Sequence, residues 1–122
     1  MIIITTQCFA PKIGGIESLM TGMAEAISGA GEDLLVLADG IKQKKDKEYR
    51  FKIKRFNGWK PIRRRQKANY LKKISEKHKV KAIYADSWKS IEYIKKINTK
   101  VIVLAHGTEI PKQYWNKMFS LL

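Results

Sequence analysis

Two adjacent glycines near the N-terminus, Gly14 and Gly15, are the residues best suited to bind an anion. They lie between a short apolar run, residues 2–6, and an amphipathic run, residues 16–30, which predicts a strand, a loop and a helix. Glycine lets backbone N–H groups approach a ligand closely, and the start of a helix carries partial positive charge. The pattern therefore predicts that this loop binds phosphate.

Three further polar residues directly follow apolar runs: Asp39, Asp86 and His106. His106 precedes a glycine and could donate to a substrate hydroxyl or phosphate, or simply bond to a neighbouring loop. Asp86 could cap the next helix or contact an acceptor molecule. Asp39 stands where a dinucleotide-binding fold has its ribose-binding acid, but a turn before Gly40 is the role we expect.

Several other chemistries are not indicated by the sequence. The dinucleotide fingerprint G-x-G-x-x-G is missing, and so is the lysine motif of P-loop proteins. The spacing of Cys8, His78 and His106 fits no metal site. We therefore expect neither a bound metal nor a resident cofactor.

Apolar runs alternate with amphipathic segments along the chain, and these must position the polar residues. Strands are predicted over residues 2–6, 34–38, 49–56, 82–85 and 101–104. Helices are predicted over residues 16–30, 62–78 and 86–97, and a further element starts at residue 110. This order predicts an α/β fold, a Rossmann-like three-layer sandwich with a mostly parallel sheet. In such sheets ligands bind at the carboxyl ends of the strands, where the glycine loop, Asp39, Asp86 and His106 all fall.

Length and composition predict one domain in a reducing compartment. The 122 residues suffice for a single domain, residues 1–122, whose last residues start an incomplete element. Cys8 is the one cysteine, which excludes an internal disulfide. No apolar stretch approaches the roughly 18–20 residues that span a bilayer, and the N-terminus does not resemble a signal peptide. We expect a cytoplasmic protein.

Positive charge is concentrated in the middle of the chain. The formal net charge is +14, and residues 42–81 hold 18 of the 25 Lys and Arg with only three acids, a net charge of +15. A polyanion or an anionic surface is the natural partner of such a segment. The alternative is a solvated face in a lysine-rich chain.

The helix predicted over residues 62–78 is basic and has a thin apolar stripe: Ala68, Leu71 and Ile74. It could lie on an anionic leaflet, at about 1 kcal/mol per basic residue, or bind nucleic-acid phosphates. The residues expected at this surface are Trp59, Lys60, Arg63, Arg64, Arg65 and Lys67. No nucleic-acid-binding motif is present, and the aromatic residues are not spaced as an RNA platform needs.

Four segments in this order resemble the N-terminal half of a family 4 glycosyltransferase with the two-domain GT-B fold. They are Phe9-Ala10-Pro11 with Gly14-Gly15-Ile16-Glu17, residues 31–37, residues 82–86, and Ala105-His106-Gly107-Thr108-Glu109. The likeness covers residues 1–111. It implies transfer of a sugar, with retention of configuration and without a metal, from a nucleotide-sugar to a sugar or lipid-linked acceptor at the inner membrane face.

The resemblance also implies roles for single residues. Gly14 and Gly15 would approach the donor diphosphate, and His106 would act catalytically beside the transferred sugar. The acceptor would contact Asp86, Trp88 and Glu109. The family's C-terminal, donor-binding half does not follow in this sequence, so the 122 residues alone are expected to be inactive. Its open cleft face would favour a homo-oligomer.

Two other functions are compatible with the residues. One is a non-catalytic module that binds nucleic acid or anionic lipid through residues 42–81. The other is a nucleotide-binding oxidoreductase domain, which the missing fingerprint disfavours.

Overall fold

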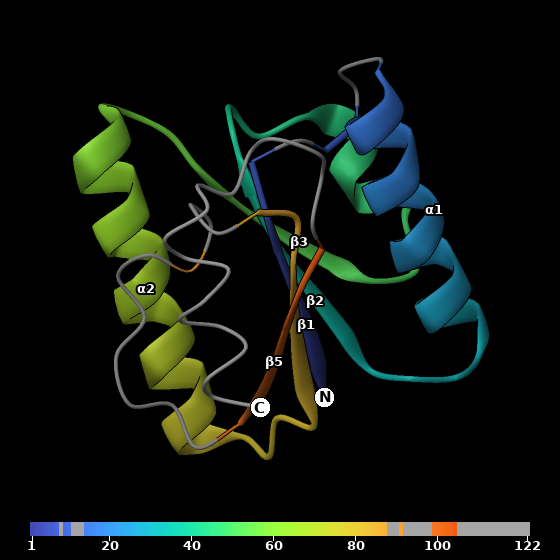
Figure 1. Ribbon diagram of the computed structural model, residues 1–122. Coiled ribbons are helices and arrows are strands. Elements are labelled where there is room, and N and C mark those ends of the chain that lie inside the picture. The colour runs from blue at the N-terminus through green and yellow to red at the C-terminus, as the bar shows by residue number, and fades with distance from the viewer. Residues whose placement is uncertain (8, 11–13, 88–90, 92–98, 105–122) are drawn as a thin grey trace.

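Five parallel strands form one sheet in the computed structural model, which describes residues 1–7, 9–10, 14–87, 91 and 99–104 (Figure 1). The strands are β1 (Ile2–Thr6), β2 (Leu34–Asp39), β3 (Lys52–Phe56), β4 (Ala82–Ala85) and β5 (Lys100–Val103). Their spatial order is β3-β2-β1-β4-β5, and every neighbouring pair is parallel. The predicted α/β fold with a parallel sheet is therefore confirmed.

One helix covers each face of the sheet, with the strands between them (Figure 1). Alternate residues of a strand point to opposite faces. On one face, Ile4 and Val36 pack with Met20 and Ala24 of helix α1 (Gly15–Gly29). On the other face, Ile3, Leu35, Leu37 and Ile83 pack with Leu71 of helix α2 (Lys60–Lys77). Because both faces are covered, the central strands read as continuous apolar runs.

Helix α1 follows the predicted amphipathic pattern. Met20 and Ala24 are buried, and Ile16, Met23 and Ile27 pack against the same core. The helix ends before Gly31, whose φ of 88° suits glycine, and the Gly31 N–H donates to the Ser28 carbonyl at 3.1 Å. Helix α1 carries no Lys or Arg, whereas α2 is rich in both.

Helix α2 starts with Pro61 in its first turn, a position that does not need the missing N–H. Its apolar contacts lie in the second half, where Leu71 is 1% exposed and Tyr70 and Ile74 pack beside it. One basic residue of the first half, Lys67, is buried on the same side. Residues 67, 71 and 74 are spaced so that they lie on one side of the helix. The buried side of α2 therefore includes one charged residue, Lys67, before the apolar Leu71 and Ile74.

The segment between β2 and β3 differs from the predicted charged loop. Residues 44–48 form a short 3₁₀ helix, η1 (Lys44–Glu48), because Asp46 folds inward. The Gln43 N–H donates to Asp46 Oδ2 at 3.0 Å, which closes the first turn. Strand β3 starts at Lys52, so Tyr49 precedes the strand that we predicted to include it. Of the helix predicted over residues 86–97, residues 88–90 and 92–97 lie outside the described residues, and so does the element predicted from residue 110.

Candidate functional site at the carboxyl edge of the sheet

The winding of the chain changes direction between β1 and β4, which are neighbours in the sheet. From β1 the chain adds β2 and β3 on one side, and then β4 and β5 on the other. In open α/β sheets, ligands bind at such a switch point, outside the carboxyl ends of the strands. We call the sheet edge where the strands end the carboxyl edge.

A buried carboxylate bridges the two strands at this switch point. Asp86, which directly follows β4, is 3% exposed. Its Oδ2 accepts a hydrogen bond from Thr6 Oγ1 at 2.7 Å and another from the Gln7 N–H at 2.8 Å. Asp86 therefore fixes the direction in which the chain leaves β1 toward the glycine loop.

Helix α2 adds a buried ammonium group beside this bridge. Lys67 is 4% exposed, and its Nζ donates to the Thr6 carbonyl at 2.7 Å. The same Nζ lies 2.5 Å from Asp39 Oδ1, and Arg63 Nε lies 3.0 Å from Asp39 Oδ2. Asp39 and Thr6, at the ends of two neighbouring strands, are thus joined through one lysine.

The contact between Lys67 and Asp39 combines a hydrogen bond with the attraction of opposite charges. Burial lowers the pKa of Lys67 because it disfavours the charged form, and the Asp39 carboxylate offsets only part of that effect. A buried ion pair of this kind contributes little net stability, so its presence marks the carboxyl edge as a candidate site.

The structure corrects two residues of the predicted anion surface. Lys67 was expected to face an anionic partner, but it is buried against Asp39 and Thr6. Arg63 is turned to the same carboxylate, and its side chain is 17% exposed. The physical reason is helical spacing, because residues 63 and 67 precede Leu71 by two turns and one turn. Asp39, expected as a turn residue, is the charge that draws both inward.

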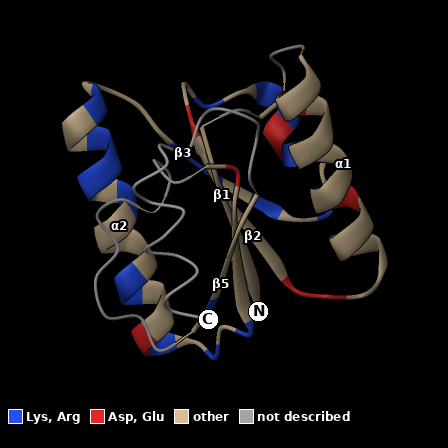
Figure 2. Cartoon of the chain, viewed as in Figure 1, with Lys and Arg blue, Asp and Glu red and all other residues tan. Residues whose placement is uncertain are grey.

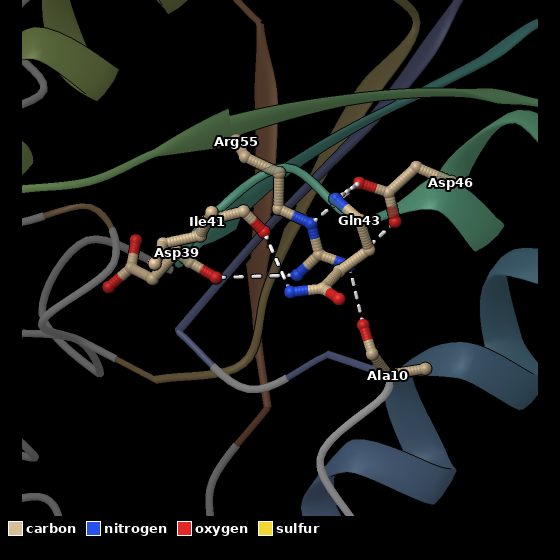
Figure 3. A network of polar contacts seen from close by, with 6 residues as sticks. All are labelled: Ala10, Asp39, Ile41, Gln43, Asp46 and Arg55. Atoms are coloured by element: carbon tan, nitrogen blue, oxygen red, sulfur yellow. Dashed lines mark hydrogen bonds and ion pairs between the residues drawn. The ribbon is translucent and has the colours of Figure 1, made fainter.

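A second buried ion pair lies at the same edge (Figure 3). Arg55, in β3, binds Asp46 of η1 through two hydrogen bonds, from Nε at 3.0 Å and from Nη2 at 2.8 Å. Its guanidinium also donates to the Asp39 carbonyl at 3.3 Å and to the Ala10 carbonyl at 2.5 Å. We call these contacts the Arg55 network.

The pKa of Asp46 reflects its place in this network. Burial raises it, but the hydrogen bonds from Arg55 and the Gln43 N–H, with the charges of Arg55 and Lys42, outweigh burial. The net effect holds the Asp46 pKa below its ordinary value, so the carboxylate is charged at neutral pH.

The two glycines open α1, as predicted. The Gly14 carbonyl accepts the first helical hydrogen bond, from the Ser18 N–H at 3.0 Å, and Gly15 is exposed. A Cβ at Gly15 would meet open space, whereas one at Gly14 would collide with the Glu17 carboxylate. Glu17 therefore lies against Gly14, where it interacts favourably with the helix start. An incoming anion must displace this carboxylate.

Exposed apolar side chains lie beside these charges. Trp59 is 72% exposed, Ile62 is 50% exposed, and Ile41 is 66% exposed just beyond β2. The turns that carry them meet, since the Gly40 N–H donates to the Phe56 carbonyl at 2.9 Å. Lys60 and Arg65 are also exposed, and Arg64 is partly buried. We call Ile41, Trp59, Lys60, Ile62 and Arg65 the basic-apolar patch.

Three predicted site residues, Trp88, His106 and Glu109, lie outside the described residues. Within the described ranges, no group of three or more His, Cys, Asp or Glu is placed to hold a metal ion. None of the described helices combines the length and the apolar character needed to cross a membrane. No protein-family model and no curated protein matches the chain.

Proposed function

We propose that the chain is the acceptor-binding half of a retaining glycosyltransferase that works at the cytoplasmic face of a membrane. The observation that carries this proposal is the switch point between β1 and β4. There Asp86 and Lys67 converge on Thr6, beside the strand that leads to the Gly14–Gly15 start of α1. This is where α/β sheets bind ligands, and two parts of the resemblance, Gly14–Gly15 and Asp86, fall at the same edge.

The mechanism that we infer is electrostatic. A nucleotide-sugar releases a diphosphate whose negative charge grows in the transition state. Exposed N–H groups at the start of α1 and the helix dipole would stabilise that charge without a metal. By the resemblance, His106 acts beside the transferred sugar. In the family that the sequence resembles, the donor is bound mainly by a second domain.

A membrane-bound acceptor accounts for the basic-apolar patch. Trp59 precedes the first residue of α2 and Ile62 lies in its first turn, and both are exposed. Helix α2 is rich in Lys and Arg, drawn in blue in Figure 2. Apolar side chains insert among lipid headgroups, while Lys and Arg are attracted to anionic lipid. The patch lies at the carboxyl edge, so a lipid-linked acceptor would reach the candidate site directly.

One observation favours a second candidate, a non-catalytic basic module. Most Lys and Arg between residues 42 and 81 are exposed, and such a surface binds any polyanion, including RNA. The two candidates differ in what they select. An acceptor-binding half recognises a sugar diphosphate headgroup, whereas a basic module recognises charge alone or a nucleic-acid structure.

A vesicle experiment separates them. The chain is incubated with vesicles that carry a polyprenyl diphosphate sugar and with phosphatidylglycerol vesicles of equal surface charge, at two salt concentrations. We expect tighter binding to the sugar diphosphate, with a preference that persists at high salt. Equal binding to both vesicles, together with salt-resistant binding to a structured RNA, would favour the basic module.

A further inference from the structure

The side chain of Arg55, in β3, contacts segments of the chain outside its own strand. Its side chain is 5% exposed, although β3 is the edge strand of the described sheet. It reaches back 45 residues to the Ala10 carbonyl and 16 residues to the Asp39 carbonyl. It also pairs with Asp46 nine residues before it. Four separate segments therefore meet at one guanidinium.

The geometry of these contacts requires arginine. Two nitrogens of the planar fork bind both oxygens of Asp46, and Nη2 also donates to Ala10. The guanidinium also lies over the Phe9 ring, with Cζ 5.8 Å from the ring centre. A lysine has a single nitrogen and cannot hold the carboxylate in two places while it donates to two carbonyls. The network therefore depends on shape as well as charge.

Phe9 and Ala10 belong to the connection between β1 and α1. Phe9 is 2% exposed and packs edge-to-face on Tyr49 and Phe51, which hold its ring in place. Ala10 has its carbonyl held by Arg55 (Figure 3). This connection leads to Gly14 and Gly15, whose N–H groups are the anion-binding groups of the proposed function.

We propose that Arg55 is a positioning residue, held by Asp46, that fixes Phe9 and Ala10 ahead of α1 and so presents the Gly14 and Gly15 amides to a diphosphate. This inference rests on the proposed function for the identity of the ligand. The positioning itself is a property of the chain and is measurable without a ligand. Arg55 touches no reacting atom in this role.

Amide hydrogen exchange of Arg55→Lys and Asp46→Asn tests the inference. Both variants keep a polar side chain but lose the two-point contact. We expect exchange at Gln7, whose N–H donates to Asp86, and at Ser18, whose N–H donates to the Gly14 carbonyl, to become at least about tenfold faster than in the wild type, because these bonds open locally. Affinity for inorganic pyrophosphate should fall in parallel, by about tenfold, which corresponds to about 1.4 kcal/mol.

Two control variants exclude a general loss of stability. Leu71→Ala weakens the opposite face of the sheet, and Lys52→Met changes an exposed residue of the same strand. Neither should accelerate exchange selectively at Gln7 and Ser18. Equal acceleration by Leu71→Ala, or exchange within twofold of wild type in Arg55→Lys and Asp46→Asn, would overturn the inference. If wild type ignores pyrophosphate while the exchange effect appears, the proposed function fails and the positioning role stands.

Discussion

The ion pairs at the two edges of the sheet differ in their exposure to solvent. At the amino edge, where the strands start, Lys81 pairs with Glu32 at 3.1 Å, and their side chains are 60% and 36% exposed. At the carboxyl edge, Lys67 meets Asp39, and Arg55 meets Asp46, with side chains between 4% and 9% exposed. The ion pair at the amino edge is therefore exposed to solvent, whereas the two pairs at the carboxyl edge are buried.

Stability alone does not explain why the carboxyl edge buries its ion pairs. An exposed pair contributes roughly 0–1 kcal/mol, and a buried pair is often no better than apolar residues of the same volume. Removing one partner of a buried pair is nevertheless strongly destabilising, because a charge stays behind. Buried pairs at the edge where α/β sheets bind ligands are therefore consistent with a role in fixing the residues of a binding site. Such pairs should be more sensitive to substitution than the exposed pair at the amino edge.

The largest expected effect is from loss of the Lys67 ammonium group. Lys67→Met should lower the free energy of unfolding by about 3 kcal/mol, because Asp39 loses its nearest cation and the Thr6 carbonyl loses its donor. Lys81→Met, the matched change at the amino edge, should lower it by less than about 1 kcal/mol. Urea denaturation measures both. Equal effects would remove the contrast between the edges.

The Asp46 carboxylate should give a smaller, pH-dependent effect. At pH 7, Asp46→Asn should cost about 1–3 kcal/mol of unfolding free energy, since the charged bonds from Arg55 weaken. The folded-state pKa of Asp46 is lowered, so its contribution is complete above about pH 4 and is lost as the pH falls through the lowered pKa. The stability difference between wild type and Asp46→Asn should therefore shrink in acid. A difference that grows in acid would contradict the assigned direction.

Alkaline titration sharpens the assignment of Lys67. Its folded-state pKa is lowered by burial, so above that pKa and below about 10.4 the unfolded chain binds more protons than the folded chain. The free energy of unfolding then rises with pH relative to Lys67→Met, and the gap between the two proteins widens. The Lys67 Nζ resonance should also titrate below the ordinary lysine pKa of about 10.4. A gap that narrows with rising pH would show that Asp39 outweighs burial.

The smallest effect on stability is expected in the basic-apolar patch. Trp59→Ala should change the free energy of unfolding by no more than about 0.5 kcal/mol, because Trp59 is 72% exposed. Its binding to phosphatidylglycerol vesicles should nevertheless fall several-fold. Leu19→Ala is the control, an exposed apolar residue on a helix without Lys or Arg. Equal losses from both variants would show that vesicle binding is not localised at the carboxyl edge.

The apolar pattern was sufficient to predict the sheet. Predicted residues 2–6 and 82–85 coincide with β1 and β4, and the parallel arrangement follows from strands that are apolar on both faces. Asp39 and Asp86 were placed at strand ends, and the structure brings both close to Thr6 through Lys67 and a direct bond. Hydrophobic periodicity is therefore informative about positions along strands.

The partners of these acids were not predictable in the same way. Hydropathy assigns Lys67 and Arg63 to solvent, whereas tertiary burial next to Asp39 depends on distant residues. The spacing of residues 63, 67 and 71 on one helical side was the available signal. Asp46, a single acid among Lys44, Lys45 and Lys47, was a similar signal for η1. A charged residue that shares the helical spacing of buried apolar residues is therefore itself a candidate for burial.

The most direct test of the account is residue-specific mapping of a diphosphate on the isotope-labelled chain. Inorganic pyrophosphate and uridine diphosphate glucose are titrated while backbone amide resonances are followed by nuclear magnetic resonance. The account predicts that the largest shifts fall on Gly14, Gly15 and Gln7, at the carboxyl edge beside Asp86. Saturable shifts confined to the exposed lysines of residues 42–54 and 72–81, with the glycine amides unchanged, would contradict it.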